Sequence, residues 1–92
     1  MQDDAVYRRC SDVRFRIVLD EGVVIKQDTA EVLVLNEVGA RVLDLVDGRR
    51  TTSDIGDALA GEFDIGDEEL RRDLAGYLAE LVEVGLVEPV AD

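Results

Sequence analysis

The side chains of this 92-residue chain that could do chemistry are carboxylates, arginines and one thiol. The chain has 22 aspartates and glutamates and 10 basic residues, but no histidine. Without an imidazole, the lone Cys10 has no ready base to activate it as a nucleophile, and the commonest metal ligand and proton carrier is missing as well. Paired carboxylates could be chosen almost anywhere, so their abundance indicates a solvated surface. These residues predict a protein without catalytic groups, metal or cofactor.

The sequence motifs of phosphate-binding and metal-dependent enzymes are absent too. There is no GxGxxG or GxxxxGK[ST] loop to hold a phosphate, and no CxxC or HExxH to hold a metal. The acidic stretch 64–69 lacks the spaced oxygen ligands and the closing glutamate of a calcium loop. It suits the start of a helix better, because acids favour the positive helix end. We therefore do not expect an enzyme.

The formal charge of −12 restricts the partners of the chain. An acidic surface repels phosphates, and the third helix expected below is itself acidic, so we expect no nucleic-acid partner. No apolar run approaches the roughly 20 residues of a membrane span. Residues 1–4 lack the basic start of a signal peptide and lead into no apolar segment. We expect a cytoplasmic protein with no membrane partner.

The elements that must position any binding surface begin with three strands. Alternating apolar residues and turn signals predict strands at 13–19, 23–27 and 31–35, paired as a short antiparallel meander. A turn is expected at 20–22, where Gly22 would supply a positive φ.

Helical spacing and cap residues predict three helices after the strands. The first two begin after Asn36 and Thr51, and the third and longest spans 67–84. The expected fold class is α+β: a winged helix-turn-helix-like domain with a three-stranded antiparallel sheet followed by three helices, β-β-β-α-α-α. We expect residues 1–12 to form an N-terminal arm and 13–92 to form one domain.

The third predicted strand is apolar on both faces. Val32 and Val34 point to one side, and Leu33 and Leu35 to the other. One face must meet the helices, so the other face needs a different cover. Either the N-terminal arm covers Leu33, or the strand borders a groove that a partner fills.

The third predicted helix also has more apolar surface than one packing contact requires. Its central stripe consists of Leu70, Leu74, Tyr77 and Leu81. Beside this stripe is a shoulder that consists of Arg71, Ala75, Leu78 and Val82. Either both rows belong to the core, or the shoulder lines a groove.

An ordered set of residues over 13–87 resembles the PqqD-like family, named after pyrroloquinoline quinone biosynthesis protein D. The set begins with Leu35-Asn36-x-x-Gly39-Ala40, Val42-Leu43-x-Leu45-x-Asp47-Gly48 and Thr51-x-x-x-Ile55-x-x-x-Leu59. It continues with Phe63, Asp73-Leu74, Leu78, Leu81 and Gly85-Leu86. Each piece alone is a common helix cap or core position, whereas the whole set at this spacing is more specific.

The resemblance implies a recognition element for ribosomally made, modified peptides. Such a module binds the leader of a precursor peptide and presents it to a modifying enzyme, frequently a radical S-adenosylmethionine (radical SAM) enzyme. In the family, the leader adds as a strand beside the third strand and packs against the third helix, a form of β-augmentation. The implied peptide-binding residues are Glu31, Val32, Leu33, Val34, Leu35, Arg71, Ala75, Leu78 and Val82.

Two matters stay open at the level of sequence. The pathway is that of pyrroloquinoline quinone, of a lasso peptide with a leader peptidase as partner, or of another ribosomal peptide. The alternative function is that of a winged-helix module that binds another protein or regulates it, without a leader peptide.

Overall fold

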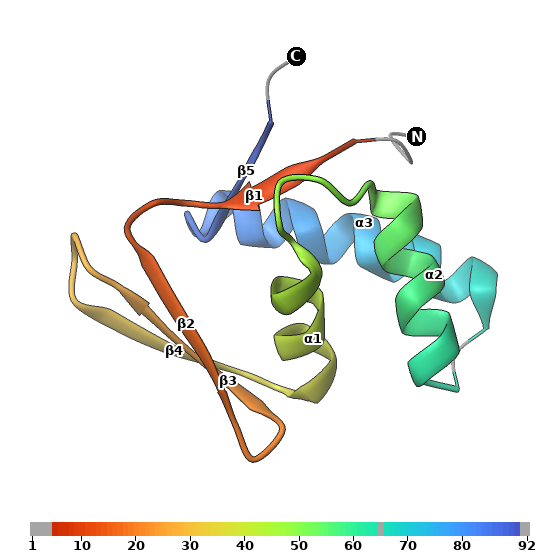
Figure 1. The fold of residues 1–92 in the computed structure, drawn as a ribbon, viewed down its shortest axis with the longest axis horizontal. Helices are drawn as coiled ribbons and strands as arrows, with labels where there is room; N and C mark the ends of the chain where they lie inside the picture. The colour runs from red at the N-terminus through yellow and green to blue at the C-terminus, as the bar shows by residue number, and fades with distance from the viewer. Residues whose placement is uncertain (1–4, 65, 91–92) are drawn as a thin grey trace.

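The computed structural model describes residues 5–64 and 66–90, which form five strands and three helices (Figure 1). In chain order these are β1 (Tyr7–Arg9), β2 (Val13–Val18), β3 (Glu21–Lys26), β4 (Glu31–Leu35), α1 (Glu37–Leu45), α2 (Thr52–Glu62), α3 (Asp67–Glu83) and β5 (Val87–Pro89). The antiparallel sheet β2-β3-β4 followed by three helices confirms the predicted α+β, winged helix-turn-helix-like fold. Strands β1 and β5 are additions to the predicted pattern.

The turn between β2 and β3 differs from the expected one. Its two residues, Leu19 and Asp20, both have positive φ angles of 49° and 71°, which matches the twist of a tight hairpin. The expectation that Gly22 occupies this turn was wrong, because Gly22 is buried within β3. Its lack of a side chain serves close packing instead: a Cβ there would lie 2.9 Å from Phe15 Cε1 and 3.0 Å from Ala40 Cβ.

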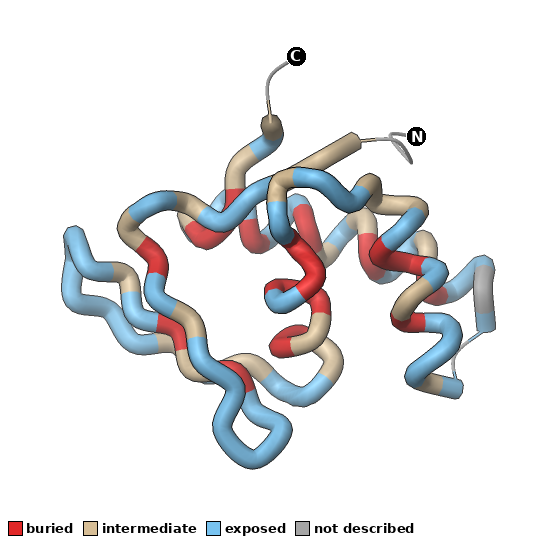
Figure 2. Tube along the Cα trace, viewed as in Figure 1, coloured by how far each residue is buried: buried red, intermediate tan, exposed pale blue. Residues whose placement is uncertain are grey.

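The two faces of the sheet differ in burial. Val24 in the central strand is fully buried, and its partners in register, Phe15 in β2 and Leu33 in β4, are half-buried against the core. This inner face meets α1, which covers it (Figure 1). The opposite, outer face is largely exposed, with Val32 and Val34 62% and 63% exposed. The exposed residues of the two hairpins are pale in Figure 2.

Local side chains define where the first two helices begin. The Asn36 side chain accepts a hydrogen bond from the backbone N–H of Gly39 at 2.8 Å, which caps α1 as predicted. At α2, Thr51 accepts from the Asp54 backbone N–H, and Asp54 accepts in return from the Thr51 N–H, both at 3.0 Å. This capping box confirms the predicted start of α2.

Helix α3 ends within one residue of the predicted end at 84. Gly85 has a φ of +82°, which a residue without Cβ adopts at low cost. Its N–H donates to the Val82 carbonyl at 3.1 Å, and the Leu86 N–H donates to the Leu81 carbonyl at 2.9 Å. These two bonds form a Schellman motif, which directs the chain out of the helix and into β5.

Strand β1, near the start of the described chain, pairs with β5, near its end. The pairing is antiparallel, with Tyr7 opposite Pro89 and Arg9 opposite Val87. The backbone N–H of Gly48 also donates to the Tyr7 carbonyl at 2.9 Å. The described part of the predicted N-terminal arm is therefore a strand that joins β5 to the loop after α1.

One core lies between the sheet, the three helices and β5 (Figure 2). Its buried apolar residues are Val13, Val24, Ala40, Val42, Leu43, Leu45, Val46, Ile55, Leu59, Leu70, Leu74, Leu78, Leu81, Leu86 and Val87. All are aliphatic, and no polar residue among the described ones is buried with them.

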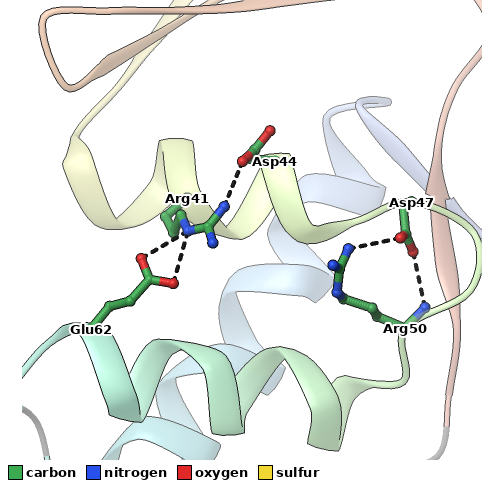
Figure 3. A network of polar contacts seen from close by, with 5 residues as sticks. All are labelled: Arg41, Asp44, Asp47, Arg50 and Glu62. Atoms are coloured by element: carbon green, nitrogen blue, oxygen red, sulfur yellow. Dashed lines mark hydrogen bonds and ion pairs between the residues drawn. The ribbon is translucent and has the colours of Figure 1, made fainter.

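An arginine of α1 joins the first two helices at the surface (Figure 3). The Arg41 Nε donates to both Glu62 carboxylate oxygens, at 2.8 and 3.0 Å, while its Nη1 contacts Asp44. The hydrogen bond from Arg41 lowers the pKa of Glu62. In the loop that follows, Asp47 accepts from the Arg50 side chain and backbone. Because these pairs are solvent-exposed, water and salt screen them and they add little to the stability of the fold.

Candidate functional site

Strand β4 has a free edge within the described structure. One side pairs with β3 from Glu31 to Leu35, and no described strand pairs with the other side. Alternate residues of an antiparallel strand direct their N–H and C=O groups to opposite sides. About half of the β4 backbone groups therefore face away from β3, and such an edge accepts another extended segment.

Strand β4 is apolar on both faces, as predicted. Leu33 and Leu35 are half-buried and pack against the core, whereas Val32 and Val34 are 62% and 63% exposed. Strand β1 pairs with β5 rather than with β4. The free edge thus lies between a covered apolar row and an exposed one.

The two flanks of α3 face different neighbours. Tyr77 lies against the start of α1, because a Cβ on Gly39 would collide with its Oη. The Val84 carbonyl, just after the helix, accepts a hydrogen bond from Lys26 Nζ of β3 at 3.0 Å. At 100° per residue, Tyr77 and Val84 fall on the same side of the helix. We call this side the sheet-side flank.

The opposite flank of α3 faces α2. Arg71 Nη2 lies 3.8 Å from Asp57 Oδ1, which belongs to α2. Ala75 is half-buried and Val82 is 37% exposed on the same side. We call this side the α2-side flank.

The predicted shoulder of the third helix does not form one partly exposed row. Leu78 is only 1% exposed and belongs to the core, so the expectation that it lines an open groove was wrong. The reason is its direction: at 100° per residue it lies about 40° from the buried Leu74, at the edge of the buried stripe next to the α2-side flank. Its companions Arg71, Ala75 and Val82 lie on the α2-side flank, away from β4.

A pocket of about 200 Å³ opens where β4 ends and the helices converge. Its lining residues are Asn36, Val38, Gly39, Val42, Leu59, Leu70, Asp73, Leu74 and Tyr77. Asn36 directly follows β4, so the pocket adjoins the end of this strand. Its walls are mostly aliphatic, with polar groups from Asn36, Asp73 and Tyr77, a combination typical of a site that holds an apolar side chain in a fixed orientation.

Tyr77 is the site residue that the sequence pattern assigned to the core. It is half-buried, and burial raises the pKa of its phenol above the usual 10.0, with a further contribution from the nearby charge of Glu80. The phenol is therefore a neutral donor or acceptor at physiological pH. The sequence signal that could have identified it is the pairing of an amphipathic ring with Gly39, a helical glycine that leaves room for it.

Other polar groups offer little chemistry. Burial and the carboxylate of Glu88, 3.7 Å from Sγ, raise the pKa of Cys10, which makes its thiol a poor nucleophile. Within 5–64 and 66–90, no cluster of cysteine, aspartate and glutamate side chains could hold a metal ion. None of the helices there combines the length and apolar character needed to cross a membrane.

Comparison with known proteins agrees with this architecture. Residues 21–87 match the family described as Coenzyme PQQ synthesis protein D (PqqD). The fold superposes with a TM-score of 0.82 and 27% identity on a structure described as TbiB1 in complex with the TbiA(beta) leader peptide, covering 92% of this chain and 99% of that one.

A second solved structure, described as lasso peptide synthetase B1 complexed with the leader peptide, has a TM-score of 0.79 and 19% identity over 90% of this chain and 98% of its own. No curated protein matches the chain significantly. Because the family match spans most of the sequence, the chain belongs to the PqqD family.

Proposed function

We propose that this chain is a non-catalytic adaptor that binds the leader of a ribosomally made precursor peptide and presents it to a modifying enzyme or a leader peptidase. Family membership supports the proposal, as does the similar structure that is described with a leader peptide bound. The absence of histidine and the protonated, half-buried thiol are in keeping with a binding role. We expect the adaptor to work in the cytoplasm, where precursor peptides are synthesised.

The observation that carries the proposal is the free edge of β4 beside an apolar pocket. A leader that adds as a strand gains backbone hydrogen bonds along Glu31–Leu35 whatever its sequence. Its side chains then supply specificity, since alternate residues point to opposite faces of the enlarged sheet. One of them reaches the pocket beyond Leu35, where Tyr77 and Val38 form part of the wall.

We further propose that the leader contacts the sheet-side flank of α3, which carries Tyr77 and Val84. This flank adjoins β3 and the start of α1, whereas Arg71 of the α2-side flank is engaged with Asp57. A strand added to β4 lies close to the first flank and is separated from the second by the helix itself. The predicted contacts at Ala75 and Val82 are the competing arrangement.

Peptide titration tests the function directly. Calorimetry with the short precursor peptide encoded next to the gene of this chain should give micromolar or tighter binding, about −8 kcal/mol. The leader half alone should bind as well as the whole precursor. A core half that binds equally well, or a leader half that does not bind, contradicts the proposal.

Two exposed valines at the end of α3 provide a matched test of the flank. Val84 is 48% exposed on the sheet-side flank and Val82 is 37% exposed on the α2-side flank. Val84→Asp should weaken leader binding about tenfold, because it replaces roughly half a valine's burial, worth about 1 kcal/mol, with an unpaired charge. Val82→Asp places the same charge near the same helix end and should leave binding unchanged. The reverse result supports the α2-side flank.

A further inference from the structure

The outer face of the sheet has an unusual concentration of exposed apolar side chains. Register puts Ile25 between Arg14 and Val32, and Val23 between Arg16 and Val34. Because residues in register share a face, these six side chains lie together on the side of the sheet opposite α1.

The exposure of this face is high for a soluble domain. Ile25, Val32 and Val34 are 42%, 62% and 63% exposed, and Val18 beside them is 44% exposed. These four are half of the large apolar residues that are exposed in the described chain. Contiguous apolar groups with a polar border are typical of interaction sites. We call this surface, consisting of Arg14, Arg16, Val18, Val23, Ile25, Val32 and Val34, the outer patch.

The charge of the outer patch is opposite to that of the molecule. Arg14 and Arg16 form a positive strip along β2, in a protein of net charge −12. The nearest acid in register is Glu21, opposite Val18 at the end of the hairpin. The charge distribution therefore favours a partner with carboxylates along one side of an apolar surface.

A second copy of the chain fits the outer patch poorly. Symmetric pairing of two outer patches would bring their arginines onto the same interface without matching acids, and two molecules of charge −12 repel each other.

We propose that the outer patch docks the enzyme that acts on the precursor, through an enzyme surface that is apolar in the middle and acidic along one side. This inference rests on the proposed function. A leader strand on β4 lies next to Val32 and Val34, so every second leader residue extends the outer patch. The added strand enlarges the sheet by about a third, about 100 Å². The enzyme therefore contacts adaptor and leader together, and loading of the adaptor strengthens docking.

Binding of the enzyme encoded next to the gene of this chain, purified and immobilised, tests the proposal. The adaptor should bind it at least threefold more tightly when saturated with the leader peptide, and by reciprocity the enzyme should tighten leader binding by the same factor. The double variant Arg14→Glu/Arg16→Glu should weaken docking at least tenfold. The matched double variant Arg49→Glu/Arg72→Glu reverses two exposed arginines outside the sheet and should not weaken it.

The outcomes separate this inference from the proposed function. Both double variants should bind the leader with wild-type affinity, since neither changes β4 or the pocket. Wild-type docking by Arg14→Glu/Arg16→Glu, docking that the leader does not strengthen, or no docking at all overturns the inference while leader binding stands. Self-association that Ile25→Thr abolishes shows that a second copy occupies the outer patch and overturns it as well. Failure of the wild-type chain to bind the leader overturns the proposed function.

Discussion

Replacing Gly39 with alanine should reveal whether Tyr77 lies where the proposed site requires it. In a helix, alanine is more stable than glycine by up to about 1 kcal/mol. Here the new Cβ would collide with Tyr77 Oη and lie 3.1 Å from its Cζ. Overpacking of this kind costs about 1–3 kcal/mol. The gain and the cost together predict that Gly39→Ala lowers the free energy of unfolding by about 1 kcal/mol.

A second substitution isolates the contact. Leucine at position 77 keeps apolar bulk but removes the outer part of the ring, so Gly39→Ala made in a Tyr77→Leu background should stabilise the protein by up to about 1 kcal/mol. The Cβ would also lie 3.2 Å from the Asn36 cap oxygen, but this contact is present in both backgrounds and cancels in the cycle. The predicted coupling between the two sites is about 1–3 kcal/mol.

Urea unfolding followed by circular dichroism measures these differences, since the chain has no tryptophan to serve as a fluorescent probe. With a slope near 1 kcal/mol/M, a change of 1 kcal/mol moves the midpoint by about 1 M. If Gly39→Ala stabilises the protein equally in both backgrounds, Tyr77 does not lie on α1. The orientation of α3, and with it the sheet-side flank, would then be wrong.

Two further predictions address α3. Leu78→Ala should lower the free energy of unfolding in urea by about 2–5 kcal/mol, because the side chain is fully buried. Val82→Ala, at an exposed position, should lower it by about 0.5 kcal/mol or less. An equally small effect for both substitutions would contradict the burial of Leu78. In a Tyr7→Phe variant, absorbance titration at high pH should give Tyr77 a pKa above 10.0, and because the folded state disfavours the phenolate, the free energy of unfolding should fall as the pH rises past 10. A Tyr77 pKa at or below 10.0 contradicts its burial.

The parts of the fold that could be predicted from the sequence are those set by neighbouring residues. The Asn36 cap, the Thr51–Asp54 capping box and the Gly85 helix end each depend on atoms within a few residues, so the side-chain types identify them. The strands of the main sheet were recognisable for a similar reason, since alternation records which face is buried.

The missed features depend on contacts between distant parts of the chain. Strands β1 and β5 have three residues each and lie about 80 positions apart, so neither has a periodic pattern and each forms because the other is present. The sequence alone places Gly22 in a turn, because a glycine that admits a close neighbour looks the same in sequence as one that supplies a positive φ.

The candidate site divides in the same way. The strand at 31–35 with two apolar faces could be predicted, because consecutive strand residues point to opposite faces and residues 32–35 are all apolar. The side of α3 that we propose for the leader could not be predicted, since helical periodicity gives the angle between Leu78 and the core stripe but not which neighbour covers each flank. That choice is made by the contacts of Tyr77 with α1 and of Arg71 with α2.

Amide hydrogen exchange along the sheet tests the central claim most directly, that β4 receives the leader as an added strand. On addition of the leader half of the precursor, exchange should slow at those amides of Glu31–Leu35 that face away from β3, and the amides of Val13–Val18 on the opposite edge should be unaffected. A proline substituted in the middle of the leader removes a ladder donor and should abolish both binding and protection. Tight binding with protection at Val13–Val18, or with no protection in the sheet, would contradict the account.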